Sequence, residues 1–307
     1  MNTMDTVKPI LKWVGGKTQI LDKLFANFPK EINNYHETFL GGGSVLLALL
    51  SQVDDGKIKV AGTINAYDIN EPLIYVYKNI QTQHTEVYAI LQTLIGELNA
   101  CPSEGVLNRK PATMEDATQT KENYYYWCRT RYNRLSVEEK RTTLGSALFI
   151  FLNKTCFRGV FRVGPNGFNV PYGHYKNPEV VNKEHLEEVH QLIQNVQFEC
   201  MDFASSISQV VVGDYAYLDP PYAPETATSF VGYTENGFGM EKHKQLFSLI
   251  HGIKEKKANF MMSNADVELV RSHFPDEVYT TETVLCKRAI NSKNPESKTN
   301  EVIITNY

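Results

Sequence analysis

Short apolar runs that end at a polar residue recur along the chain, and stretches of helical period lie between them. Runs of this kind predict buried strands of a largely parallel sheet. We expect such strands at residues 35–40, 63–67, 196–201, 215–218 and 259–262. Two more runs, 277–286 and 301–307, bracket a polar loop and predict a closing hairpin. Helical period predicts helices at 18–28, 45–50 and 241–256. The pattern predicts an α/β fold.

The alternation of strands and helices breaks between about residues 71 and 194. Helical period there covers 75–98, 124–132 and 137–153, and 101–121 is a polar loop. Asn166-Gly167 lies between two alternating segments, which predicts a β-hairpin over 155–173. We therefore expect one domain made of 1–75 and 195–307, with a helical insertion at 76–194. The glycines within 229–238 predict a mobile flap.

The central strand, 215–218, ends abruptly at Asp219-Pro220-Pro221-Tyr222. Proline lacks an N–H, so the chain leaves the sheet there and Asp219 stays at the carboxyl end, where α/β sheets bind ligands. The exocyclic amine of a nucleobase is a poor nucleophile because its lone pair is delocalised into the ring. The Asp219 carboxylate and the Pro220 carbonyl could accept its two N–H bonds, while Tyr222 stacks on the base. An ordinary proline turn is the plainer alternative.

A second set of residues predicts a nucleoside-type cofactor site. Phe39-Leu40-Gly41-Gly42-Gly43-Ser44 joins a strand to a helix, and Asp68 ends the next strand. Glycines let backbone approach a ligand, and an acid at this position typically binds ribose hydroxyls. Asp202 and Phe203 follow another strand and suit hydrogen bonding to, and stacking on, a cofactor adenine. Trp13 and Lys17 offer a flat face and a cation. Gly16-Lys17-Thr18 imitates a P-loop, but Leu11 stands where that motif needs glycine.

Charge is distributed unevenly along the chain, whose net charge is −4. Residues 127–176 hold nine lysines and arginines, Arg129 and Arg131 among them, against two acids. A basic segment in an acidic protein is typical of a phosphate-facing surface, although a merely solvated face is an alternative. On the hairpin, Arg158 and Arg162 could each make bidentate contacts to guanine in a major groove. Five scattered cysteines favour free thiols and a cytoplasmic, reducing compartment.

Together these motifs resemble the DNA adenine methyltransferase (Dam) family, in which cofactor motifs precede the catalytic tetrad. Residues 11–17 are similar to its N-terminal motif, whose tryptophan and lysine positions, Trp13 and Lys17, bind S-adenosylmethionine. The glycine segment resembles the family's Glu-Pro-Phe motif, with Thr38 in place of proline. Phe168-Asn169-Val170-Pro171 resembles the recognition hairpin, which adds Pro171 to the DNA-binding residues. Arg162 falls on the guanine-reading arginine and Lys12 on another base-contacting position, whereas Arg158 replaces a frequent asparagine.

The resemblance implies a class I S-adenosylmethionine-dependent methyltransferase sheet of seven strands, with the helical insertion as DNA-recognition unit. It implies N6 methylation of a flipped adenine in double-stranded DNA, with GATC as the preferred target and Asp219, Pro220 and Tyr222 as catalytic residues. The cofactor residues are expected to be Trp13, Lys17, Phe39, Gly41, Gly43, Ser44, Asp68, Asp202, Phe203 and Asp219.

Several alternatives stay open at this stage. N4-cytosine methylation uses the same tetrad, and a nucleotide-binding regulatory DNA-binding protein is the rival from another class. We expect no metal, no membrane association and no obligate protein partner. A restriction–modification pair, a solitary regulator and a viral enzyme are all compatible with the sequence.

Overall fold

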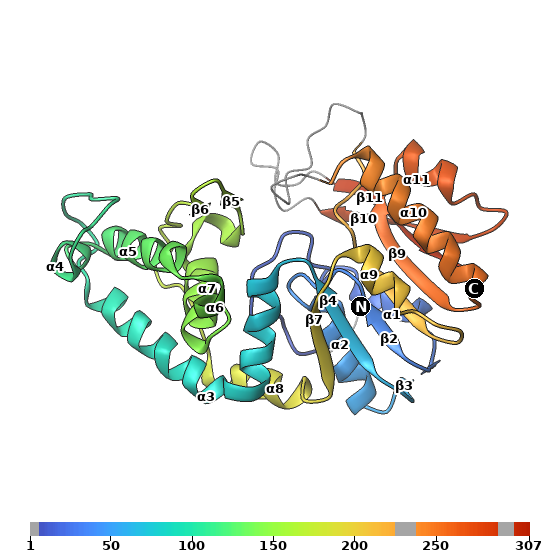
Figure 1. Ribbon diagram of the computed structural model, residues 1–307, viewed down its shortest axis with the longest axis horizontal. Helices are drawn as coiled ribbons and strands as arrows, with labels where there is room; N and C mark the ends of the chain where they lie inside the picture. Colours follow the sequence, from blue (N-terminus) through green and yellow to red (C-terminus); the bar gives the residue numbers. More distant parts are fainter. Residues whose placement is uncertain (1–5, 225–237, 288–297) are drawn as a thin grey trace. The chain divides into compact units, whose positions relative to one another are not determined.

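The computed structural model describes residues 6–224, 238–287 and 298–307 (Figure 1). The chain divides into two compact units. The first contains Lys17–Ile69 and Asn195–Tyr307, and the second contains Val7–Gly16 and Asn70–Gln194. The predicted flap at 229–238, apart from Phe238, and most of the polar loop before Glu301 lie outside the described residues.

The first unit is built on a seven-stranded sheet with the strand order β10-β11-β9-β8-β2-β4-β7. Neighbouring strands run parallel from β9 to β7, and β11 is antiparallel to both β9 and β10. This confirms the class I methyltransferase sheet with its C-terminal antiparallel hairpin. In sheet order the strands are Thr280–Lys287, Lys298–Thr305, Asn259–Ala265, Tyr215–Leu218, Tyr35–Glu37, Ile64–Asp68 and Val196–Cys200. A separate short parallel pair joins β1 (Glu31–Ile32) to β3 (Lys59–Val60).

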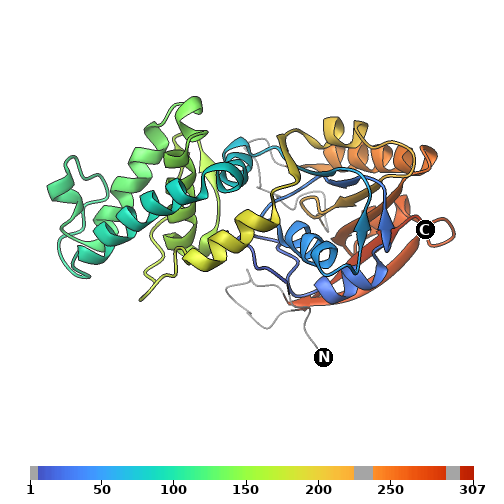
Figure 2. The ribbon, with the colours of Figure 1, turned by 90° about the horizontal axis from the view of Figure 1, so that it is seen from below.

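Helices cover both faces of this sheet, as the buried strands require. Figure 2 shows α1 (Leu21–Asn27) and α2 (Ser44–Asp54) on one face, and α9 (Phe203–Ser208) and α10 (Met240–Glu255) on the other. Rings of Phe28, Tyr35, Tyr215 and Tyr217 pack together on one face. The second face carries an apolar core that includes residues of β8, β9, α10 and α11 (Glu268–His273). Strand β8 is therefore buried on both sides, which explains its continuous apolar sequence.

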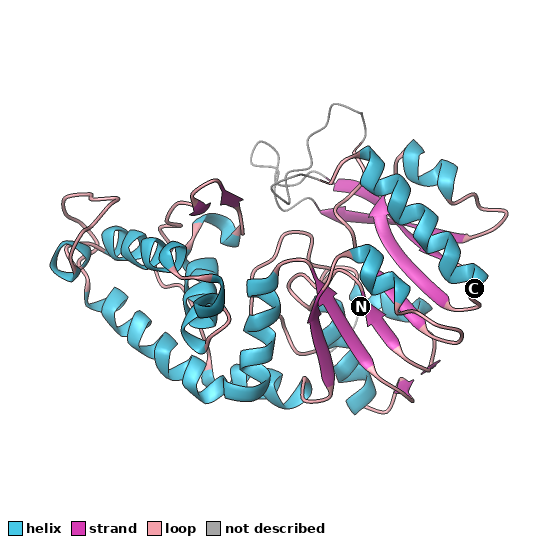
Figure 3. Ribbon diagram, in the orientation of Figure 1, coloured by secondary structure: helices cyan, strands magenta, loops and turns pink. Residues whose placement is uncertain are grey.

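The second unit is mainly helical, with only the short strands β5 (Val163–Gly164) and β6 (Gly167–Phe168) (Figure 3). Its longest helix, α3 (Glu71–Ala100), packs against α7 (Thr143–Thr155) and α8 (Lys183–Leu192). The remaining elements are α4 (Met114–Ala117), α5 (Lys121–Arg134), α6 (Val137–Lys140) and the 3-10 helix η1 (Phe157–Gly159). Within the described residues, no helix combines the length and the apolarity that crossing a membrane would need.

The structure corrects two sequence-based predictions in this unit. The single helix expected at 137–153 is two helices, because Ser136 and Thr142 each cap a new helix start. Gly145 allows the tight junction, since a Cβ there would lie 2.5 Å from the Lys140 carbonyl oxygen. The hairpin is closed by a bridge between Cys156 and Tyr172, but Arg158 lies in η1 with a φ of 58° and not on a strand.

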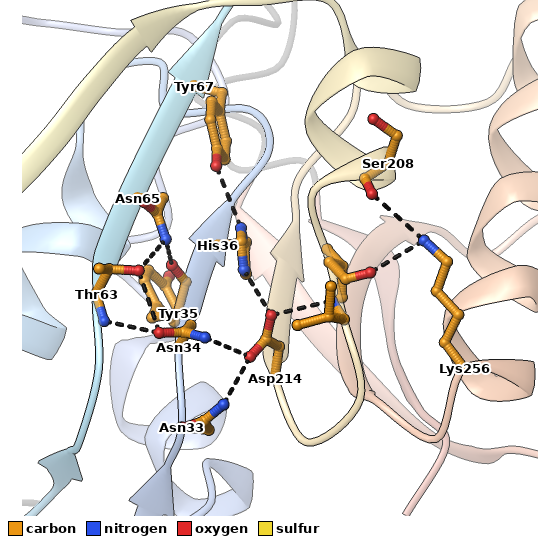
Figure 4. Close-up of polar contacts among 12 residues, drawn as sticks. Asn33, Asn34, Tyr35, His36, Thr63, Asn65, Tyr67, Ser208, Asp214 and Lys256 are labelled. Atoms are coloured by element: carbon orange, nitrogen blue, oxygen red, sulfur yellow. Dashed lines mark hydrogen bonds and ion pairs between the residues drawn. The ribbon is translucent and has the colours of Figure 1, made fainter.

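A buried polar network lies at the amino ends of the sheet strands, opposite the end where ligands are expected (Figure 4). Asp214 precedes β8 and accepts hydrogen bonds from the side chains of Asn33 and Asn34 and from the Val211 N–H. His36 Nε2 lies 3.0 Å from Oδ2 of Asp214. Burial raises the pKa of Asp214, but these partners together lower it below the ordinary value. A His–Asp pair with all of these contacts acts as a structural clamp between β2 and β8.

Candidate active site

Asp219 follows β8 directly, at the carboxyl end of the sheet, and pairs with a lysine from far away in the sequence. Lys17 Nζ lies 2.7 Å from Asp219 Oδ2. The lysine side chain is only 4% exposed and the aspartate 19% exposed, so both charges are largely removed from water. The same ammonium group lies 5.0 Å from the centre of the Tyr222 ring. The predicted acid, cation and aromatic ring therefore meet at one place.

Burial raises the pKa of Asp219 from its ordinary value of 3.8 to about 6. The nearby Lys17 charge opposes this shift, and Glu301 adds to it. Near pH 7.5 the group is therefore mainly a carboxylate that accepts hydrogen bonds, and it gains a proton as the pH falls through about 6.

Three residues that the sequence did not single out individually hold the Asp219–Tyr222 turn. The Tyr222 hydroxyl donates to Glu301 Oε2 on β11 at 2.5 Å. The Ala223 N–H donates to Asn264 Oδ1 on β9 at 3.0 Å. His243 Nε2, on α10, lies 3.0 Å from the Pro221 carbonyl oxygen. Asn264 could have been suspected, because it lies at the carboxyl end of the strand next to β8, whereas no sequence pattern marks His243.

The glycine segment lies beside this turn and is held by the predicted acid. The Gly41 N–H donates to Asp68 Oδ2 at 2.9 Å, which connects the loop after β2 to the end of β4. Gly43 precedes α2 with a φ of 71°, a conformation that favours glycine. Ser44 Oγ accepts a hydrogen bond from the Lys17 N–H at 3.0 Å. The loop therefore positions the segment that carries Lys17.

The remaining cofactor residues predicted in the first unit are two aromatic rings, Phe39 and Phe203, and the acid Asp202. Phe39 stacks on Phe203 with ring centres 6.2 Å apart, and Phe238 contacts both rings. Asp202 is exposed and caps α9 by accepting from the Ser205 N–H at 2.7 Å. Aromatic rings and strand-end carboxylates suit the adenine and the hydroxyls of a nucleoside, which fits the predicted cofactor class.

Glu37 is a buried acid close to this site. Its side chain is 2% exposed and accepts a hydrogen bond from the Tyr35 hydroxyl at 2.6 Å. Burial raises the pKa of Glu37 to about 8, against the opposing effect of the Tyr35 hydrogen bond. The acid is therefore mainly protonated at neutral pH.

This pKa predicts a specific dependence of stability on pH. Between about pH 4.5 and 8 the native state binds a proton that the unfolded chain releases, so the free energy of unfolding falls as pH rises through that window. Glu37→Gln should remove this contribution. We expect the variant to lose less stability than wild type between pH 5 and 8 in urea unfolding, with Glu86→Gln, an exposed acid, as control. Parallel curves for wild type and Glu37→Gln would contradict the assignment.

Trp13 and Lys12 belong to the second unit. The Trp13 indole stacks on Phe161 and Phe149, with ring centres 5.8 and 6.4 Å away. The Lys12 backbone pairs in both directions with the Asn153 side chain, and its ammonium lies 4.2 Å from the Tyr175 ring centre. Their predicted roles in cofactor and DNA binding stay predictions.

The other predicted DNA-binding residues also lie in the second unit. Arg162 is exposed, and its Nε donates to Asn169 Oδ1 at 2.7 Å. Arg158 and Arg131 are exposed as well. Arg129 instead donates to the Val170 carbonyl and lies over the Tyr126 ring, so it supports the hairpin. The Pro171 carbonyl closes the hairpin base by accepting from the Phe157 N–H.

Comparison with known proteins shows the family to which the chain belongs. A family model described as D12 class N6 adenine-specific DNA methyltransferase matches residues 13–288. The Type II methyltransferase M.MjaIII of Methanocaldococcus jannaschii is 35% identical over 98% of this chain and 99% of its own length. DNA adenine methylases of Haemophilus influenzae and Escherichia coli are 30% and 29% identical, over 95% and 98% of this chain and 90% and 95% of their own lengths.

Because the family model spans most of the chain and the relatives match end to end, the similarity includes both the sheet and the helical unit. The protein belongs to the D12 class N6 adenine-specific DNA methyltransferases.

Proposed function

We propose that the protein methylates N6 of an adenine that is flipped out of duplex DNA, within GATC, with S-adenosylmethionine as methyl donor. The observation that carries this proposal is the Asp219 carboxylate, which Lys17 holds at the carboxyl end of β8 beside the glycine segment. A largely buried carboxylate next to the Pro220 carbonyl can accept hydrogen bonds from both N–H groups of one amine.

Residues at the carboxyl end of the same sheet support a sulfonium nucleoside as cofactor. Asp68 ends β4, Asp202 follows the adjacent parallel strand β7, and both offer carboxylates to hydroxyl and amino groups. The first N–H groups of α2 follow Gly43, which provides no side-chain cap. When bound, S-adenosylmethionine supplies an electrophilic methyl group.

The chain's own residues would act on the target base. Asp219 and the Pro220 carbonyl accept hydrogen bonds from the two N6–H groups, which favours the pyramidal geometry of a nucleophilic nitrogen. Tyr222 stacks on the base, which contributes roughly 1–3 kcal/mol. That gain offsets part of the cost of flipping, which is a few kcal/mol. The Glu301 and His243 contacts keep the turn rigid, so positioning is in place before the base arrives.

Arg162 is the proposed reader of guanine, and Asn169 orients its guanidinium through the 2.7 Å hydrogen bond. Because the bond uses Nε, the two terminal nitrogens keep N–H groups that could bind a base edge. We expect Arg162→Ala to cost about 1–3 kcal/mol in kcat/KM and to relax preference at one guanine. Arg131→Ala, which removes an exposed arginine outside the hairpin, should weaken binding without changing preference. Unchanged preference in Arg162→Ala would contradict this role.

The target sequence can be tested directly by methylating random-sequence DNA with the purified protein and mapping the modified bases. The proposal predicts N6-methyladenine in GATC. Modified adenine in another sequence would refute the target but not the reaction, and N4-methylcytosine would favour the chemical rival.

A nucleotide-binding regulator is the alternative from another class. The described segment Val7–Gly16 contains no strand, and the Lys17 ammonium is buried against Asp219 and not presented to a phosphate. Titration of ATP with Mg²⁺ against S-adenosylmethionine separates the two, since our proposal predicts binding of the latter only.

A further inference from the structure

Helix α3 is kinked at Gln83, whose φ of −144° and ψ of 32° are not helical. Side chains of α8 and of the residues after it bind the turn before this kink. His190 Nδ1 lies 2.9 Å from the Ile80 carbonyl oxygen, and Gln194 Nε2 donates to the Gln81 carbonyl at 3.1 Å. These contacts hold α8, and the residues after it, to the kinked turn of α3.

A cluster of three metal-ligating side chains lies at this junction. His84 follows the kink directly, and its Nε2 lies 2.8 Å from Glu187 Oε2 on α8. The rings of His84 and His190 stack with centres 3.7 Å apart. Glu187 and His190 are three residues apart on α8 and so share one face. One ligand atom from each residue lies within 4.8 Å of the others.

The hydrogen bonds around the cluster leave donor atoms available to a cation. The Ile80 carbonyl oxygen can only accept, so His190 Nδ1 carries the hydrogen between them, and Nε2 of the neutral ring keeps its lone pair. Gln194 Nε2 also lies 3.1 Å from Nδ1, but its two hydrogens are directed to the Gln81 and His190 carbonyls, at 3.1 and 2.7 Å. A backbone carbonyl that orients the second ring nitrogen in this way is typical of histidine ligands to metals. Glu187 Oε1 accepts from Gln191, which leaves Oε2 for His84 or a cation.

We propose that His84, Glu187 and His190 bind a divalent transition metal ion of the Zn²⁺ type. Two imidazoles and one carboxylate suit such ions, with water as the fourth ligand. Tetrahedral Zn²⁺ with bonds of about 2.0–2.1 Å brings its ligand atoms to about 3.3 Å from one another. Small side-chain rotations would achieve this, because all three side chains are partly exposed. The ion would replace the proton shared by His84 and Glu187 and hold α8 to the kinked turn of α3.

The test uses the whole chain, treated with EDTA and then dialysed. Zn²⁺ is titrated by calorimetry, and Co²⁺ binding is followed through its visible absorption. We expect one equivalent to bind to wild type and to raise the melting temperature. His84→Gln and Glu187→Gln should bind at least tenfold more weakly, whereas Glu188→Gln, an exposed neighbour on α8, should bind like wild type.

Cys200 is an exposed thiol that could also bind Zn²⁺, so every variant is compared in a Cys200→Ser background. Equal affinity in Glu187→Gln and Glu188→Gln, or no binding by wild type at 1 mM Zn²⁺, would overturn the proposal. If His84→Gln unfolds, the comparison of Zn²⁺ affinity between Glu187→Gln and Glu188→Gln still tests the proposal. Methyl transfer is not the readout, so failure here leaves the proposed function unaffected.

Discussion

Asp219→Ala should lower turnover roughly 10²–10⁴-fold, the range for removal of a positioned polar catalyst. The variant loses the carboxylate that accepts a hydrogen bond from N6 and that lies 2.7 Å from the buried Lys17 ammonium. S-adenosylmethionine should still bind measurably, because the proposed contacts of Asp68, Asp202 and the glycine segment stay intact. Single-turnover methyl transfer and calorimetric titration of the cofactor measure the two effects separately.

Two variants sharpen this experiment. Asp219→Asn keeps one acceptor oxygen in the same place, so it should retain more activity than the alanine variant. Asp276→Ala removes an aspartate that is 72% exposed in the same unit and should behave like wild type. Near-normal turnover in a folded Asp219→Ala protein would end the catalytic assignment.

Lys17→Met should move the acidic limb of the pH–rate profile upward by about 1–3 units, the effect expected when a close opposite charge is removed. In wild type, activity should fall as the pH falls through about 6, because burial raises the pKa of Asp219 to that value while Lys17 limits the rise. Without Lys17 the protonated, inactive form should persist near neutral pH. A shift of about 2 units, the middle of this range, should lower activity about tenfold at pH 7 and restore most of it at pH 9.

The control for this experiment is Lys23→Met, which removes an exposed lysine on α1. Circular dichroism establishes whether each variant is folded at each pH. An acidic limb at the same pH in wild type and Lys17→Met would show that Asp219 is not the titrating group.

The sheet could be predicted from the sequence because its central strands are buried on both faces. The bounds of β8, Tyr215–Leu218, agree with the prediction, because the acid and two prolines that follow the apolar run end the strand there. The glycine segment and Asp68 were likewise predicted to lie near each other, and the Gly41–Asp68 hydrogen bond connects them.

The supports of the site could not be predicted, because they depend on contacts between distant parts of the chain. Nothing in a single sequence indicates that Lys17 contacts Asp219 or that Tyr222 contacts Glu301. His243 sits in an ordinary amphipathic helix and is recognised only through its contact with Pro221. By contrast, the start of α6 had a sequence signal, since Ser136 and Glu139 form a capping box. Thr142, which caps α7, has Gly145 three residues later, so no such box marks the break between the two helices.

The most direct test of the central claim is transfer of a labelled methyl group to duplex DNA, followed by analysis of the product nucleosides. We expect N6-methyladenine from wild type and almost none from Asp219→Ala at equal enzyme concentration. Folded wild-type protein that binds S-adenosylmethionine yet leaves no N6-methyladenine in any DNA would contradict it.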